Sequence, residues 1–171
     1  HLASIPNTKR FTPQDVVNTL PLGLIVDLTN TNRYYDRRDF TRKGVDHVKI
    51  AVPGKMVPPW RIVERFIDIV NGYRNDPYSS GKLIGVHCTH GLNRTGYLVC
   101  AYMILQLGYR PDEAISLFNS HRGHKMEHEY YLASLRDMQP RERSSDHRPP
   151  MHHNAPPELS RESWDPTIRR I

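Results

Sequence analysis

The sequence predicts an α/β domain with a central, mainly parallel sheet that is flanked by helices. Residues 23–28 and 82–87 are apolar runs that suit strands buried on both faces, and helical patterns separate them. Alternation of strands and helices is typical of a parallel sheet covered by helices. Ligands of such sheets bind beyond the carboxyl ends of the strands, so the loops at those ends are the first places to look for a site.

The first half of the chain supplies two of the expected strands. Thr12 followed by Pro13 is typical of a helix start, and Gly44 is typical of a helix end. The polar residues 29–33 follow the first strand, and a Pro-Gly pair breaks the second. The expected elements are a helix over 13–20, a strand over 23–28, a helix over 35–43 and a strand over 47–52.

The second half is richer in helices. Residues 59–74 carry one wide apolar stripe at helical spacing, which predicts a helix lying against the sheet. A turn-rich loop over 75–81 leads to the strand that precedes the longest apolar run of the chain. The expected elements are a helix over 59–74, a strand over 82–87 and helices over 97–107, 111–118 and 126–138.

The length and composition of the chain limit the classes of protein to which it can belong. The 171 residues allow one ordinary domain, expected over 1–140, followed by a Pro-rich basic tail over 141–171 in which Trp164 is the one residue among Phe, Tyr and Trp. A net charge of +6 favours an acidic partner. Two cysteines argue against a disulfide scaffold, and no apolar run reaches membrane-spanning length. Because the chain begins at His1 without Met, we expect further sequence upstream.

The segment 86–96 carries the chemistry. It places Cys88, five residues and then Arg94 between a buried strand and a buried helix. Such a loop can wrap around a tetrahedral oxyanion with its backbone N–H groups, and the helix N-terminus adds positive charge. Arg94 can offer a two-pronged fork to phosphoryl oxygens, and the positive surroundings favour a nucleophilic Cys88 thiolate that Thr95 can stabilise. The residues expected to cradle the phosphate are Thr89, His90, Gly91, Leu92, Asn93 and Arg94.

Two simpler interpretations compete. A cysteine at a strand end is usually a core residue, which is also our interpretation of Cys100 within the apolar helix. The His-Cys-Thr-His string can suggest a metal site, but structural zinc normally needs four ligands and no second cysteine pair stands at zinc spacing. The complete loop is more specific than either alternative, and we predict neither a metal nor another cofactor.

The need of a leaving group for a proton restricts the class of bond that this site can cleave. Alkoxide and phenolate, with a phenol pKa of about 10, need a general acid to leave. Residues 51–58, which follow the second strand, contain no carboxylate. A phosphate leaving group has a pKa of about 6 and departs unaided, with Lys55 available to stabilise its charge. The sequence therefore favours a phosphoanhydride, unless Asp27, Asp36 or Asp39 reaches the site.

At this point the chain resembles a known family, the RNA 5′-triphosphatases of the cysteine-phosphatase superfamily. The resemblance is carried by residues 24–35, 82–97 and 122–124, extends over about 12–138, and includes the capping-enzyme triphosphatases, baculovirus RNA phosphatases and RNA/RNP-interacting phosphatases. It implies the cysteine-phosphatase fold, the nucleophile at Cys88 and the phosphate-binding arginine at Arg94. It also implies a metal-independent enzyme that removes the γ and then the β phosphate of 5′-triphosphorylated or diphosphorylated RNA.

Partners and outer contacts also follow from the resemblance. It implies RNA and ribonucleoprotein partners, a monomer, no membrane association, and a nuclear location with additional cytoplasmic activity. Relatives carry an arginine where this chain has His128, which is a candidate to contact a second phosphate when protonated. Arg122 and His124 are the substitute candidates for that contact, and Arg33 is a candidate for the RNA-facing rim. An upstream basic segment and strand of the family are expected to be missing here.

Three functions remain open at this stage. The first is an RNA 5′-polyphosphatase, without the guanylyltransferase domain of a capping enzyme. The second is a dual-specificity protein phosphatase or phosphoinositide phosphatase, which requires a carboxylate able to reach Cys88. The third is a non-catalytic RNA-binding adaptor that keeps the loop only as an anion pocket. The intact Cys88 and Arg94 favour the first two functions.

Overall fold

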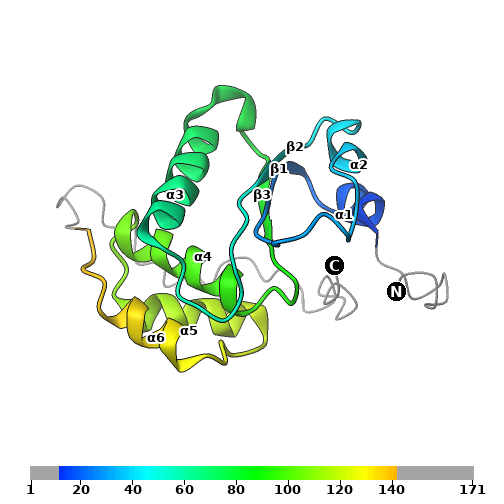
Figure 1. Ribbon diagram of the computed structural model, residues 1–171. Coiled ribbons are helices and arrows are strands. Elements are labelled where there is room, and N and C mark those ends of the chain that lie inside the picture. Colours follow the sequence, from blue (N-terminus) through cyan, green and yellow to red (C-terminus); the bar gives the residue numbers. More distant parts are fainter. Residues whose placement is uncertain (1–11, 142–171) are drawn as a thin grey trace.

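The computed structural model describes residues 12–141 and confirms the α/β class (Figure 1). The predicted tail, including Trp164, lies outside the described residues, so its boundary stays a prediction. Three parallel strands form the sheet in the order β2-β1-β3. Their bounds are Leu22–Asp27 for β1, Asp46–Lys49 for β2 and Leu83–His87 for β3.

Helices cover both faces of this sheet. Figure 1 shows α1 and α2 on one side, and α3 to α6 gathered on the other. The bounds are Pro13–Thr19 for α1, Arg38–Thr41 for α2, Trp60–Asn75 for α3, Asn93–Leu105 for α4, Pro111–Arg122 for α5 and Glu129–Arg136 for α6, with a short 3-10 helix η3 at Pro77–Ser79. No helix within residues 12–141 has the length and apolar character needed to cross a membrane.

Several boundaries differ from the expectation, including those of α5, which runs on to Arg122, and of α6, which is shortened to Glu129–Arg136. The helix predicted over 35–43 is reduced to α2, because the Asp36 carboxylate accepts a hydrogen bond from the Arg38 backbone N–H (2.9 Å) and forms a turn there. The strand predicted over 47–52 ends at Lys49. Helix α4 begins four residues before the apolar run, since the last residues of the loop form its first turn.

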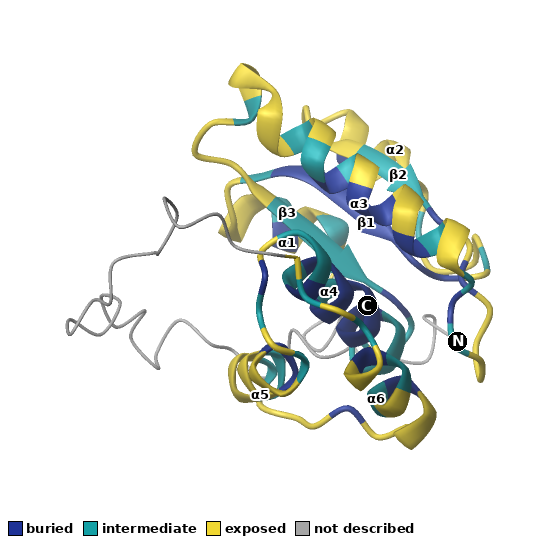
Figure 2. Ribbon diagram, turned by 90° about the vertical axis from the view of Figure 1, so that its left-hand side faces the viewer, coloured by how far each residue is buried: buried dark blue, intermediate teal, exposed yellow. Residues whose placement is uncertain are grey.

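Helix α4 is the centre of the core (Figure 2). It packs against α3, α5 and α6, and most of its residues are buried. The approach to α5 is close: a Cβ added at Gly96 would lie 2.7 Å from Cε1 of Phe118. This packing fixes the amino end of α4 beside the carboxyl end of β3, which is where the site lies.

The core prediction is tested at Leu98, which is fully buried in α4. Leu98→Ala is expected to lower the free energy of unfolding by about 2–5 kcal/mol, because it removes apolar contacts and leaves a cavity. Leu117→Ala, at a side chain 37% exposed on α5, is the matched control and should cost about 1 kcal/mol or less. Denaturant titration measures both changes, and equal losses would contradict the assignment of α4 as the core helix.

Candidate active site

The loop between β3 and α4 forms a bowl around Cys88. Cys88 directly follows β3 and is 4% exposed. Gly91 has a φ of +64°, a left-handed conformation that favours glycine and lets the chain curl. Leu92 is the N-cap of α4 and makes no side-chain capping hydrogen bond, so no side chain at the cap occupies the N–H groups of the first turn. An uncapped helix start of this kind can accept an anion.

The surroundings of Cys88 favour its ionised form. Burial raises the pKa of the thiol, but hydrogen bonds from the Thr95 hydroxyl and from the backbone N–H groups of Thr95 and His90 outweigh it. The charge of Arg94 acts in the same direction, and the net pKa is lowered. Cys100 is the contrast: burial without such donors raises its pKa to about 12.

The Thr95 hydroxyl is placed to donate a hydrogen bond to the Cys88 sulfur. The side chain is buried, and within residues 12–141 its oxygen meets no partner with full hydrogen-bond geometry. A buried hydroxyl without a well-formed hydrogen bond is destabilising. A negatively charged sulfur at Cys88 would satisfy it, so the arrangement suits a thiolate better than a thiol.

The Arg94 side chain is locked in place from three directions. Nη1 donates to the carbonyl oxygens of Leu28 (3.3 Å) and Val52 (2.9 Å), at the carboxyl ends of β1 and beyond β2. Nη2 donates to Oγ1 of Thr89 (2.7 Å). Within the described residues Nε has no acceptor, and Nη2 keeps a second hydrogen. One edge of the guanidinium is thus available for two phosphoryl oxygens.

The side chains of Arg122 and Asn93 form further hydrogen bonds that hold the loop. Nε and Nη2 of Arg122, at the end of α5, donate to the carbonyl oxygens of Gly91 (3.0 Å) and His90 (3.4 Å). Oδ1 of Asn93 accepts from the backbone N–H groups of Glu127 (2.9 Å) and His128 (3.3 Å). Arg122, expected as a second-phosphate contact, supports the loop through its carbonyl oxygens.

A buried polar network lies next to the loop and was not predicted from the sequence. The Tyr35 hydroxyl is 2.7 Å from Nε2 of His87 and 2.9 Å from Nε2 of His47, so it donates to one ring and accepts from the other. Burial lowers the pKa of both histidines, although Asp27 opposes this, which favours neutral rings. His87 precedes Cys88, so this chain of contacts holds the start of the loop.

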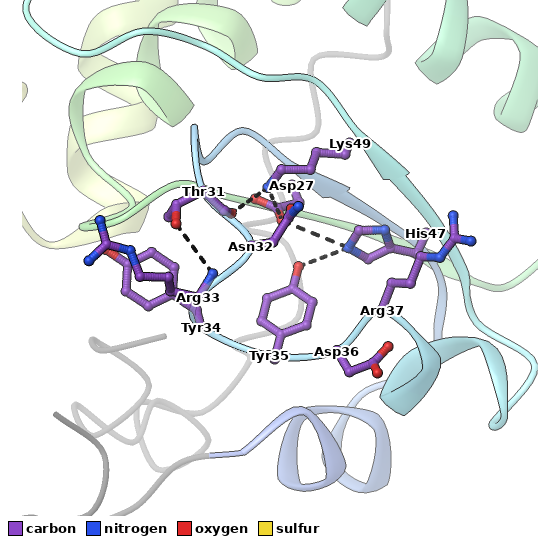
Figure 3. Close-up of a pocket in the computed structure, with 10 residues that line it drawn as sticks. All are labelled: Asp27, Thr31, Asn32, Arg33, Tyr34, Tyr35, Asp36, Arg37, His47 and Lys49. Carbon is purple, nitrogen blue, oxygen red and sulfur yellow. Dashed lines mark hydrogen bonds and ion pairs between the residues drawn. The ribbon is translucent and has the colours of Figure 1, made fainter.

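Asp27 is the charged centre of that network (Figure 3). Its carboxylate accepts from the backbone N–H (2.8 Å) and hydroxyl (2.6 Å) of Thr29 and from Nζ of Lys49 (2.8 Å). Burial raises the pKa of Asp27, but these hydrogen bonds outweigh it and the pKa is lowered. The sequence offered one signal here, since Asp27 is the one charged residue in the apolar run 23–28.

Two of the three carboxylates considered as proton donors from the sequence, Asp27 and Asp36, have lowered pKa values and are poor proton donors at neutral pH. Asp27 is ionised and fully engaged. A hydrogen bond from Arg38 lowers the pKa of the exposed Asp36 to about 2, and Nε of Arg38 lies 2.8 Å from its Oδ2. A general acid must hold its proton at the working pH.

The outer residues named from the sequence are spread around the bowl. Lys55 is exposed in the loop after β2, at a φ of +62°. His124 is exposed after α5, and the exposed His128 stacks on Tyr130 with ring centroids 5.1 Å apart. Arg33 is exposed and lines a separate pocket. Within the described part of the chain, no group of histidine, cysteine and acidic side chains is placed to hold a metal.

Comparison with known proteins identifies the family. The model of the dual specificity phosphatase catalytic domain matches residues 5–141. The chain belongs to the dual-specificity phosphatases. This confirms the resemblance to cysteine phosphatases that was drawn from the loop, and it gives the chain a cysteine-dependent phosphatase domain.

Relatives place this phosphatase more narrowly. The chain is 48% identical over 126 residues to a tyrosine-protein phosphatase of Autographa californica nuclear polyhedrosis virus, covering 73% of this chain and 74% of that one. It is 46% identical over 132 residues to the RNA/RNP complex-1-interacting phosphatase of Homo sapiens, covering 74% and 40%. It is 50% identical over 115 residues to the RNA/RNP complex-1-interacting phosphatase homolog of Caenorhabditis elegans. That match covers 67% of this chain and 49% of the relative. The chain thus spans half or less of the RNA/RNP-named relatives.

Solved structures agree on the fold. The crystal structure of PTPMT1 in complex with PI(5)P has a TM-score of 0.57 at 20% identity, covering 68% of this chain and 75% of that one. The active form of Tk-PTP has a TM-score of 0.58 at 20% identity, covering 73% and 84%.

The pKa of Cys88 supplies a prediction. Thr95→Ala removes a hydrogen bond to the sulfur, so the pKa of the thiol should rise and alkylation of Cys88 by iodoacetamide at neutral pH should slow. The acid limb of the kcat/KM profile should move to higher pH with it. Thr95→Ser keeps the hydroxyl and should leave both profiles close to wild type. Identical pH profiles for all three proteins would contradict the role of the hydroxyl.

Proposed function

We propose that this phosphatase is an RNA 5′-polyphosphatase, which removes the γ and then the β phosphate of 5′-triphosphorylated RNA and leaves a 5′-monophosphate. The observation that carries this proposal is the lowered pKa of Cys88 beside the open edge of Arg94, together with the lowered pKa values of Asp27 and Asp36. A site without a proton donor suits a leaving group that needs none. The names of the RNA/RNP-interacting relatives support RNA as the substrate.

The first step transfers the terminal phosphoryl group to sulfur. The Cys88 thiolate attacks the γ phosphorus and forms an S–P bond while the bond to the β–γ bridging oxygen breaks. The electron pair leaves with that oxygen, as the terminal phosphate of a diphosphate end. Arg94 and the N–H groups of residues 89–94 hold the three equatorial oxygens, where negative charge is spread in the transition state.

The second step releases the phosphate. Water attacks the phosphorus of the phosphocysteine, the S–P bond breaks, and the sulfur keeps the electron pair as a thiolate. Both hydrogens of the water stay with the phosphate, which departs as dihydrogen phosphate. Thr95 donates to the sulfur as its charge returns. The same two steps on the diphosphate end then remove the β phosphate and leave the monophosphate.

The viral relative's name, a tyrosine-protein phosphatase, favours a second candidate function. Cleavage of a phosphotyrosine ester expels a phenolate with a pKa of about 10 when no acid protonates it. The site described here has no such acid in residues 51–58. Phosphotyrosine is therefore the comparison substrate rather than the preferred one. Ribonucleoprotein partners are a proposal that rests on the names of the RNA/RNP-interacting relatives. A nuclear location is a proposal that rests only on the family resemblance.

The experiment follows the two phosphates separately. Short 5′-triphosphate RNA labelled at the β or the γ position is incubated with the protein in EDTA, beside a phosphotyrosine peptide. We expect release of both labels, much faster than from the peptide, and a loss of about 10⁴-fold or more in Cys88→Ser.

Each other outcome has a definite meaning. Release of the γ label alone would make the enzyme a triphosphatase of the capping type. Faster turnover of the peptide would contradict the proposal and assign the enzyme to the protein phosphatases. Tight binding of RNA without any turnover would support the adaptor function.

A further inference from the structure

We propose that the pocket between residues 31–37 and strand β2 binds the 5′-terminal nucleoside of the RNA and the phosphodiester that follows it. This inference rests on the proposed function and adds to it a specificity site outside the phosphate loop. The pocket encloses about 610 Å³ (Figure 3). That volume lies within the range of about 300–1,000 Å³ that is common for small-molecule sites. Its walls are Asp27, Thr31, Asn32, Arg33, Tyr34, Tyr35, Asp36, Arg37, His47 and Lys49.

The position of the pocket matches the geometry of a polyphosphate end. Asp27 at its floor is the Cα partner of His87 in the neighbouring strand, and adjacent strands lie about 4.8 Å apart. Cys88 follows His87, so the phosphate bowl and the pocket open at the same edge of the sheet. A chain of two or three phosphates bound at Cys88 is therefore expected to lead along this edge toward the pocket.

The pocket has an excess of positive charge. Each of its two carboxylates already has a cation, Asp27 with Lys49 and Asp36 with Arg38. Lys49 is also bound to Oγ1 of Thr29 and to the carbonyl oxygen of Thr31, at 2.8 Å each.

Two pocket guanidiniums remain for a ligand. Within residues 12–141 the guanidinium groups of Arg33 and Arg37 have neither a hydrogen-bond nor an ion-pair partner. Two guanidiniums without partners on one pocket wall fit a phosphodiester, whose oxygens accept from such forks.

The remaining lining groups fit a nucleobase. Tyr34 lines the pocket and is 39% exposed, and an exposed aromatic residue can stack on a base. The side-chain amide of Asn32 has no partner among the described residues and can pair with a base edge. Tyr35 and His47 form a fixed wall, since the Tyr35 hydroxyl lies 2.9 Å from Nε2 of His47. These features favour a nucleotide over a simple anion.

The test separates the pocket from the catalytic bowl. Variants Tyr34→Ala and Arg33→Ala/Arg37→Ala are assayed on short 5′-triphosphate RNA, on ATP and on inorganic triphosphate. The matched control is Arg42→Ala, an exposed arginine at the end of α2 outside the pocket.

We expect kcat/KM on RNA to fall about tenfold or more in each pocket variant, with activity on inorganic triphosphate unchanged. The double arginine variant should affect ATP less than RNA, because ATP lacks the 3′ phosphodiester. Equal losses on RNA and inorganic triphosphate, or no loss on RNA, would overturn the proposal.

A binding measurement tests the pocket proposal separately from the proposed function. Fluorescent 5′-triphosphate RNA is titrated into Cys88→Ser protein with and without the pocket substitutions. Suppose that the pocket variants weaken binding about tenfold while wild-type turnover of RNA is poor. The proposal that the pocket binds the nucleoside is then supported, and the polyphosphatase proposal fails. If turnover is efficient but the substitutions leave binding unchanged, the pocket proposal fails alone. Failure of the RNA to bind Cys88→Ser protein overturns it as well.

Discussion

A negative charge on a buried sulfur is the constraint on which the rest of this structure depends. Cys88 is nearly inaccessible, and burial opposes its ionisation. The thiolate is favoured only because Thr95, two backbone N–H groups and the charge of Arg94 converge on it. Those donors come from the start of α4, whose position is set by the packing of α4 against three other helices. Core packing and the chemistry of the site are therefore linked through one helix.

The same loop is tied to all three strands of the sheet. Arg94 reaches the carbonyls of Leu28 and Val52, while the Tyr35 hydroxyl joins His87 at the end of β3 to His47 in β2. These contacts hold the guanidinium with one edge free and hold the backbone on either side of the nucleophile. An arginine fixed before substrate arrives needs little reorganisation in the transition state. Rigidity of the bowl thus comes from hydrogen bonds to strand ends as well as from apolar packing.

Much of this arrangement could be predicted from the sequence, because local patterns determine it. Continuous apolar runs indicated the buried strands, and the spacing between Cys88 and Arg94 indicated the phosphate loop. The network around Tyr35 could not be predicted, since its contacts join residues 12 and 52 positions apart in the chain. Only the strand order β2-β1-β3 brings them together. The support of the loop by Arg122 was missed for the same reason.

The proposed chemistry depends on a leaving group that departs without a proton, and one measurement tests this directly. A series of aryl phosphates with leaving-group pKa values from about 4 to about 10 is assayed for kcat/KM at neutral pH. Without a general acid, charge builds on the leaving oxygen, so kcat/KM should fall steeply as the leaving-group pKa rises. A nearly flat dependence would contradict the account, because it would require a side chain that protonates the leaving oxygen.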